Sequence, residues 1–108
     1  MACQTPVVAS AVGGITEVVV HGETGYLIPM TQQTEPPFEP MDPEQFSRDL
    51  ARHINPLLAD NSLRKEMGAK GRQRAEANFS WGAIANQVVD VYESLIRQHP
   101  RISGVPAA

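Results

Sequence analysis

The 108-residue chain is short of cysteine, of aromatic residues and of long apolar runs. Its single cysteine, Cys3, excludes an intrachain disulfide, and its place beside an apolar segment predicts a small buried side chain rather than a nucleophile. His21, His53 and His99 share no metal-ligand spacing with Cys3 or with one another, so we expect no metal site. No stretch approaches the roughly 20 apolar residues of a membrane-spanning helix, and the N-terminus lacks a signal-peptide pattern. We therefore expect a cytoplasmic chain without a membrane partner.

An excess of positive charge is also missing. Nine Lys and Arg residues stand against twelve Asp and Glu residues, for a formal net charge of −3. Nucleic-acid binding needs a basic surface, so we expect no nucleic-acid partner. Five basic residues do gather between positions 64 and 74, but Glu66 and Glu76 are interleaved with them. This pattern favours a solvated helix face over a polyanion site. The five residues are Arg64, Lys65, Lys70, Arg72 and Arg74.

Four blocks of different composition follow one another along the chain. Residues 1–29 are apolar, small and broken by glycines, whereas residues 30–41 form a polar, proline-rich loop. Helix formers dominate the third block, and Pro100, Gly104 and Pro106 mark the last. We expect one partial domain over residues 1–98 and a flexible tail over residues 99–108.

The first block predicts two short strands joined by turns. Residues 6–10 are apolar without alternation, which is typical of a parallel strand buried on both faces. Gly13 and Gly14 follow, at a turn that needs unusual backbone angles or close approach. Residues 15–20 favour a strand by β-branched propensity, but a short helix is the alternative. Residues 26–28 predict the second strand.

The start of the first long helix carries three agreeing signals. Asp42 can cap it, Pro43 suits the first helical position, and Gln45 can reach back to the cap. The helix should run over residues 43–60, with Pro56 kinking or splitting it. The residues predicted to share its buried face are Phe46, Leu50, Ile54, Leu57 and Leu58.

Two further helices are predicted after it. One covers residues 62–78, where Gly68 and Gly71 either weaken the helix or allow close packing on a neighbouring element. The other covers residues 81–98 and is capped by Ser80. The residues predicted to point inward are Leu63, Met67 and Ala75 in the first helix, and Ile84, Val88, Val91, Tyr92 and Leu95 in the second.

Several separated motifs carry a resemblance to one family. They are the segments Ala2–Ser10 and Gly13–Val19, the residues Gly22, Gly25, Leu27 and Pro29, and the pairs or triplets Leu63-Arg64, Met67-Gly68, Gly71-Arg72 and Phe79-Ser80-Trp81. In this order they resemble the last third of retaining glycosyltransferases of the glycogen-synthase and sucrose-phosphate-synthase kind. The resemblance covers roughly residues 1–97, and the loop over residues 31–41 resembles the longer insertion of bacterial glycogen-synthase-like members.

The resemblance implies an enzyme of two Rossmann-like domains that binds its nucleotide sugar mainly through the second. This chain resembles the end of that second domain. We therefore expect an α/β fold, a partial Rossmann-like C-terminal domain with about two short parallel strands and three to four helices. The implied reaction moves a hexose, such as glucose, from ADP- or UDP-glucose to a glucan or other acceptor with retention. The nucleotide sugar is a substrate, and no cofactor is expected. The N-terminal domain would be a partner, and the isolated chain would be inactive.

The resemblance also implies a donor-sugar site at the loop after the first strand. Its residues are Gly13, Gly14, Thr16 and Glu17. A diphosphate at the start of a helix after a parallel strand fits the usual crevice of such sheets. The alternatives are an ordinary strand-to-helix turn and, for Glu17, a carboxylate that only complements the helix dipole. We expect no catalytic residue in this segment.

The family's paired glutamates would fall before Met1, which adds to the expectation of inactivity. Two further departures are Gln4, where the family favours glycine, and Thr16, where it often has proline. These two departures motivate a second hypothesis, a non-catalytic helical interaction module. Under either hypothesis, an unpaired edge on the strand over residues 6–10 and an apolar outer face on the last helix predict self-association.

Overall fold

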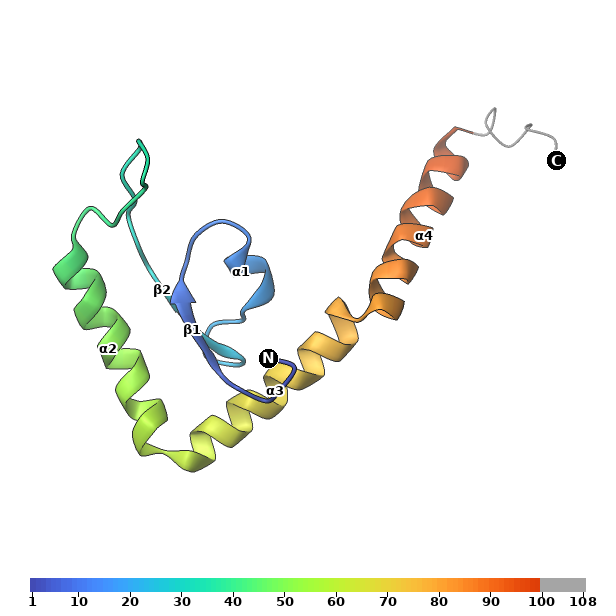
Figure 1. Ribbon diagram of the computed structural model, residues 1–108. Helices are drawn as coiled ribbons and strands as arrows, with labels where there is room; N and C mark the ends of the chain where they lie inside the picture. Colours follow the sequence, from blue (N-terminus) through green and yellow to red (C-terminus); the bar gives the residue numbers. More distant parts are fainter. Residues whose placement is uncertain (100–108) are drawn as a thin grey trace. The chain divides into compact units, whose positions relative to one another are not determined.

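The computed structural model describes residues 1–99, and over these residues it has two strands and four helices (Figure 1). The α/β class predicted from the sequence is confirmed. The chain divides into two compact units, Met1–Ala75 and Glu76–Ala108, each of which is described by itself. Apart from His99, the predicted tail over residues 99–108 lies outside the described residues.

The first unit is built around a two-stranded parallel sheet. Strand β1 (Val7–Ser10) pairs with β2 (Gly25–Ile28), and the register sets Val7 opposite Gly25. The predicted pair of short parallel strands is therefore confirmed. However, β1 is half-buried along its whole length, so the prediction of burial on both faces is wrong. Burial of both faces needs a packed layer on each side of a sheet, and over residues 1–99 the sheet has only two strands, with helix α2 (Pro43–Ala59) packed against both.

Helix α1 (Ile15–Val18) decides between the two alternatives for the segment after the glycines. The strand favoured by β-branched propensity is wrong. The helix is one turn long and closes with a hydrogen bond from the Val19 amide to the Ile15 carbonyl, at 3.0 Å. Val19 is buried, and the next amide, that of Val20, donates to the buried Thr24 hydroxyl at 3.0 Å. Tertiary anchoring of the segment that leaves the helix thus overrides local propensity.

Helix α2 (Pro43–Ala59) packs against both strands. Its predicted cap is confirmed, because the Asp42 carboxylate accepts a hydrogen bond from the Gln45 amide at 3.0 Å. The Gln45 side chain does not reach back to the cap and instead donates to Asp49 at 3.0 Å. The helix is not split at Pro56, and it ends at Ala59 because Asp60 takes an extended backbone.

The core of the first unit is small. Leu57 of α2 is buried as predicted, but the adjacent Leu58 is 71% exposed, so its place in the buried face is wrong. One step of 100° around the helix carries Leu58 away from the sheet. Phe46, Leu50 and Ile54 are half-buried. The buried apolar side chains are Val19, Ile28, Leu57 and Met67.

Helix α3 (Asn61–Phe79) packs along the first residues of the chain. A Cβ added to Gly68 would stand 1.9 Å from the Gln4 carbonyl oxygen, so this glycine allows close packing, as one of the two alternatives predicted. The Arg72 guanidinium also donates to the Ala2 carbonyl at 2.7 Å. The N-terminal segment is therefore held against α3 by backbone contact and by one guanidinium.

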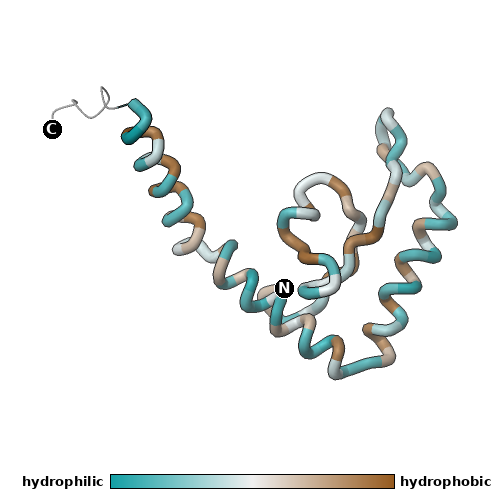
Figure 2. Tube along the Cα trace, turned by 180° about the vertical axis from the view of Figure 1, so that it is seen from behind, coloured by the Kyte–Doolittle hydropathy of each residue, from teal (hydrophilic) through white to brown (hydrophobic). Residues whose placement is uncertain are grey.

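The second unit contains the end of α3 and helix α4 (Trp81–Gln98). Ser80 caps α4 as predicted, with its hydroxyl accepting from the Ala83 amide at 3.2 Å. Apolar and polar residues alternate along this helix in Figure 2. The predicted burial of its apolar stripe is wrong, because those side chains are 37% to 62% exposed. Over residues 76–99 the unit holds only the end of α3 and α4, which leaves the stripe uncovered. The stripe is Ile84, Val88, Val91, Tyr92 and Leu95.

None of the helices over residues 1–99 combines the length and the apolar character needed to cross a bilayer.

Candidate functional site

Two loops leave the carboxyl ends of the parallel strands. Strand β1 leads to Gly13 and Gly14, and β2 leads to the loop over residues 29–41. Because the strands are parallel, both loops start from the same edge of the sheet, where ligands of such folds bind. A hydrogen bond from the Ala11 amide to the Ile28 carbonyl, at 2.8 Å, joins the two loops at the points where they leave the strands.

The two glycines have different backbone conformations. Gly13 has φ of +52°, in the left-handed region that favours glycine. Gly14 has φ of −70° and ψ of −7°, which any residue can adopt. A Cβ added to either would meet no atom of the structure within 4 Å. The chain path therefore favours glycine at position 13, whereas neither the path nor the described neighbours favour it at position 14.

The remaining predicted site residues fold the loop onto the helix. The Thr16 hydroxyl donates to the Gly13 carbonyl at 3.1 Å, and the Glu17 amide donates to the Gly14 carbonyl at 3.1 Å. Both Thr16 and Glu17 are exposed. The structure thus places all four residues on one exposed turn at the carboxyl edge of the sheet.

A residue missed by the sequence analysis holds the other end of this turn. Arg74 of α3 donates from Nε to the Val18 carbonyl at 2.8 Å and from Nη2 to the Glu17 carbonyl at 2.7 Å. The sequence placed Arg74 on a solvated helix face. Because the contact joins positions 56 and 57 residues apart, no local pattern could have signalled it.

The other members of the basic cluster divide between backbone contacts and solvent. The Arg64 guanidinium donates to the carbonyls of Leu57 and Leu58, and so joins the end of α2 to α3. Lys70 stays on the surface with Glu66, at 2.8 Å, and this hydrogen bond and charge raise the pKa of Lys70. Arg72 is exposed, as predicted for a solvated face, whereas Arg64 and Arg74 are half-buried. All three also donate to main-chain carbonyls, which need donors where elements meet.

Neither Cys3 nor a histidine takes part in the hydrogen bonds described above for the glycine turn. Cys3 is exposed, so its predicted burial is wrong. It lies in a surface turn closed by the Gln4 amide on the Met1 carbonyl, at 2.9 Å, ahead of the sheet rather than in it. Over residues 1–99 no three His, Cys, Asp or Glu side chains gather in a way that could hold a metal ion.

Two histidines meet in space although they are far apart in the sequence. The ring centroids of His21 and His53 are 6.1 Å apart, and Tyr26 lies 5.0 Å from His53. His21 Nδ1 accepts the Leu27 amide at 3.0 Å, so this imidazole supplies a hydrogen-bond acceptor to β2. Its role is structural, since it satisfies a main-chain donor of the strand.

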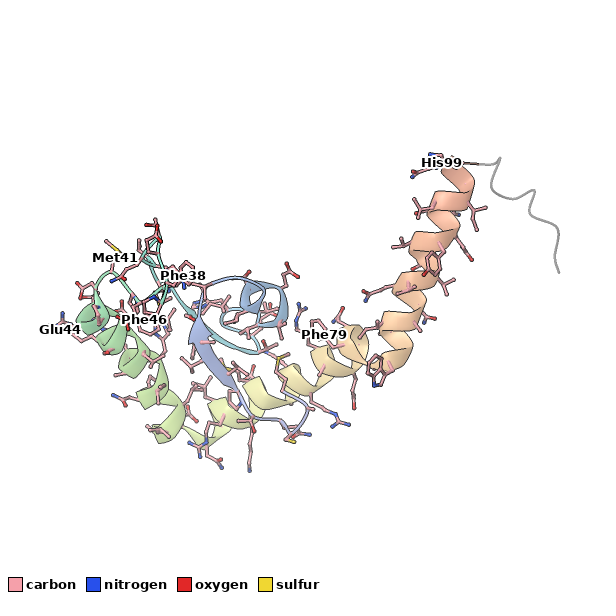
Figure 3. The ribbon with its side chains drawn as sticks, turned by 45° about the horizontal axis from the view of Figure 1, so that its top comes forward. Phe38, Met41, Glu44, Phe46, Phe79 and His99 are labelled. Carbon is pink, nitrogen blue, oxygen red and sulfur yellow. The ribbon has the colours of Figure 1, made fainter. Side chains whose placement is uncertain are left out.

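The loop over residues 29–41 forms a short hairpin-like turn before α2. The Met41 amide donates to the Thr31 carbonyl at 2.8 Å, which closes it. Phe38 and Met41 of this loop are exposed, and Figure 3 labels both of them together with Phe46 of α2. A cavity of about 210 Å³ lies between the loop and α2, lined by Met30, Thr31, Met41 and Phe46 among others.

A two-stranded parallel sheet with helix α2 packed against it and a glycine turn at its carboxyl edge matches part of a Rossmann-like domain. The family model of "Glycosyl transferases group 1" matches residues 1–60. The chain therefore belongs to the group 1 glycosyltransferases, as the resemblance predicted.

Individual relatives agree with this assignment. The chain is 41% identical over 95 residues to alpha-maltose-1-phosphate synthase of Mycolicibacterium smegmatis, covering 88% of this chain and 22% of that protein. It is 37% identical over 98 residues to D-inositol 3-phosphate glycosyltransferase of Salinispora tropica, covering 91% and 17%. Among solved structures, sucrose-phosphate synthase of Thermosynechococcus elongatus superposes with a TM-score of 0.65 at 39% identity, covering 90% of this chain and 21% of that one. The chain thus spans about a fifth of the length of these relatives.

Proposed function

We propose that the chain supplies part of the donor-binding domain of a hexosyltransferase. The reaction would move glucose, or a related hexose, from ADP- or UDP-glucose to a glucan or other acceptor with retention of configuration. Membership of the glycosyltransferase family supports this proposal. The names of two similar proteins, alpha-maltose-1-phosphate synthase and sucrose-phosphate synthase, support a hexose as the transferred group.

Gly14 is the observation that carries the proposed site. Its backbone angles suit any residue, and a Cβ there would meet no described atom within 4 Å. Glycine at such a position is explained when a ligand needs close access to the backbone. A diphosphate is the part of the donor that fits this edge of a parallel sheet. We therefore assign the diphosphate to the turn of Gly13 and Gly14.

Thr16 and Glu17 would contact the sugar end of the donor. Both side chains are exposed on the same turn as the glycines. A carboxylate accepts hydrogen bonds from sugar hydroxyls, and a hydroxyl group can both donate and accept. Glu17 would then orient the sugar rather than exchange a proton with it, because no second carboxylate accompanies it on α1.

The isolated chain is proposed to be inactive in sugar transfer. It spans about a fifth of its relatives' length and carries no proposed catalytic residue. Titration of the ¹⁵N-labelled chain with ADP-glucose and UDP-glucose should shift the amides of residues 13–17 weakly, while calorimetry detects little or no heat. Gly14→Val should abolish those shifts, and Lys70→Ala, on the exposed face of α3, should preserve them. Shifts elsewhere but not at residues 13–17 would refute the site, and robust transfer by the chain alone would refute its inactivity.

A non-catalytic interaction module is the second candidate, favoured by the exposed apolar face of α4. Its side chains from Ile84 to Leu95 lie 37% to 62% exposed. Under the first proposal the N-terminal domain of the enzyme is the partner of this chain; in its absence a second copy takes that place. Over residues 1–99 strand β1 pairs only with β2, and its other edge adds a further surface for association. We expect sedimentation to show concentration-dependent self-association that Val88→Glu reduces; a monomer at all concentrations would contradict it.

A further inference from the structure

We infer that Arg74 is a positioning residue for the proposed donor site. Its guanidinium holds the C-terminal end of α1 and thereby sets the direction of the turn formed by Gly13 and Gly14. The expected effect of Arg74 on donor binding rests on the proposed function. Its effect on the main chain of residues 13–18 does not, because that effect can be measured without a ligand.

The contact is specific in its geometry. Nε and Nη2 of one planar guanidinium donate to the carbonyls of two consecutive residues, Val18 at 2.8 Å and Glu17 at 2.7 Å. These carbonyls belong to the last turn of α1, where no amide of the helix is left to donate to them. The fork of an arginine suits two adjacent acceptors better than the single ammonium of a lysine.

Helix α1 depends on such external contacts because it is one turn long. A helix of this length is not stable by itself, since its nucleation cost is not repaid. Within it the Val19 amide closes on the Ile15 carbonyl at 3.0 Å. Three tertiary anchors lie at its C-terminal side: the Arg74 guanidinium, the buried Val19 side chain and the Thr24 hydroxyl that accepts from Val20.

The opposite end of the turn is open. A Cβ at Gly13 or Gly14 would meet nothing within 4 Å, and both residues are exposed. The turn is thus anchored at one end and free at the end where the donor is proposed to bind. Loosening the anchored end changes the direction of the free end, and a small misplacement of a binding group lowers affinity strongly.

Arg72 provides a matched control on the same helix. It also donates from its guanidinium to a main-chain carbonyl at 2.7 Å, but that carbonyl belongs to Ala2 and not to α1. Arg74→Ala and Arg72→Ala therefore each remove from α3 an arginine that donates to a main-chain carbonyl. The first variant takes donors from the carbonyls of α1 and the second takes a donor from Ala2, so a loss of positioning and a general loss of stability give different results.

The experiment measures ¹⁵N relaxation and amide exchange of residues 13–18, the thermal unfolding midpoint, and UDP-glucose affinity from amide shifts, in the full 108-residue chain. We expect Arg74→Ala to increase the mobility of residues 13–18 and to weaken UDP-glucose binding about tenfold. Arg72→Ala should leave both unchanged even if its midpoint falls equally. Arg74→Lys should restore part of the affinity, because an ammonium can still donate to one of the two carbonyls.

The outcomes separate this inference from the proposed function. If UDP-glucose shifts no amide of residues 13–17 in the parent chain, the proposed site fails, and the mobility of those residues alone decides the role of Arg74. Unchanged mobility in Arg74→Ala would overturn the inference, as would equal effects of Arg72→Ala and Arg74→Ala on mobility or affinity.

Discussion

The carbonyl oxygen of Gln4 occupies the space that a side chain on Gly68 would need. A Cβ at position 68 would stand 1.9 Å from that oxygen and 2.7 Å from the carbonyl carbon. Neither group can move away freely, since both belong to the main chain. This contact fixes how the segment that leads into β1 approaches α3, and it explains why a helix interior tolerates glycine here.

Gly68→Ala should therefore destabilise the first unit. We expect a loss of about 1–3 kcal/mol in the free energy of unfolding, measured in urea, because added volume in a close contact forces the backbone to shift. Gly71→Ala is the matched control, since its Cβ would meet the flexible Met1 side chain at 3.5 Å, an ordinary contact. That variant should be neutral or gain up to about 1 kcal/mol from helix propensity. A Gly68→Ala variant as stable as Gly71→Ala would refute this account.

Replacing Gln4 by glycine should stabilise the chain. Its φ of +59° lies in the left-handed region, which costs a residue with a Cβ roughly 1 kcal/mol. Gln4→Gly should raise the unfolding free energy by about that amount, and Gln4→Ala should leave it nearly unchanged because the strain remains. Equal stability of the glycine and alanine variants would show that the backbone relaxes without cost.

The two site glycines should respond differently to alanine. Gly13→Ala places a Cβ on a residue at φ of +52° and should cost about 1–2 kcal/mol in unfolding free energy. Gly14→Ala, at φ of −70°, should not destabilise the chain. The same pair measured by donor titration tests the binding role, since only a loss of affinity without a loss of stability marks Gly14 as a ligand contact. A destabilised Gly14→Ala variant would remove that argument.

The start of α2 offers a test of capping. Asp42→Ala removes the carboxylate that accepts the Gln45 amide at 3.0 Å and should cost about 1 kcal/mol. Gln45→Ala keeps that bond and loses only a side-chain contact with Asp49, so it should cost less than about 0.5 kcal/mol. Urea unfolding followed by circular dichroism measures both. A reciprocal cap would instead make the two losses similar.

Local signals predicted much of the fold. The caps at Asp42 and Ser80, the turn at Gly13 and the two short strands each depend on residues within about four positions, and all of them form. The four site residues also come together, because Gly13 to Glu17 are nearly consecutive and a turn alone keeps them close. Such features need no knowledge of distant partners.

Other features could not be predicted in this way. Residues 15–18 are helical against their β-branched propensity, because Val19 is buried and Arg74 holds the carbonyls at the end of the turn. Cys3 is exposed although it precedes an apolar strand. In each case the outcome depends on which element lies beside the segment, and that element is encoded far away in the chain.

By itself, the sequence determined the order of strands and helices, their caps and the membership of the glycosyltransferase family, since these depend on neighbouring residues and on motifs at set spacings. Only the tertiary structure decided that Arg64, Arg72 and Arg74 serve main-chain carbonyls and that the apolar face of α4 stays uncovered within its own unit. The physical reason is that burial and long-range hydrogen bonds belong to pairs of segments, and a pattern along one segment carries no record of the other.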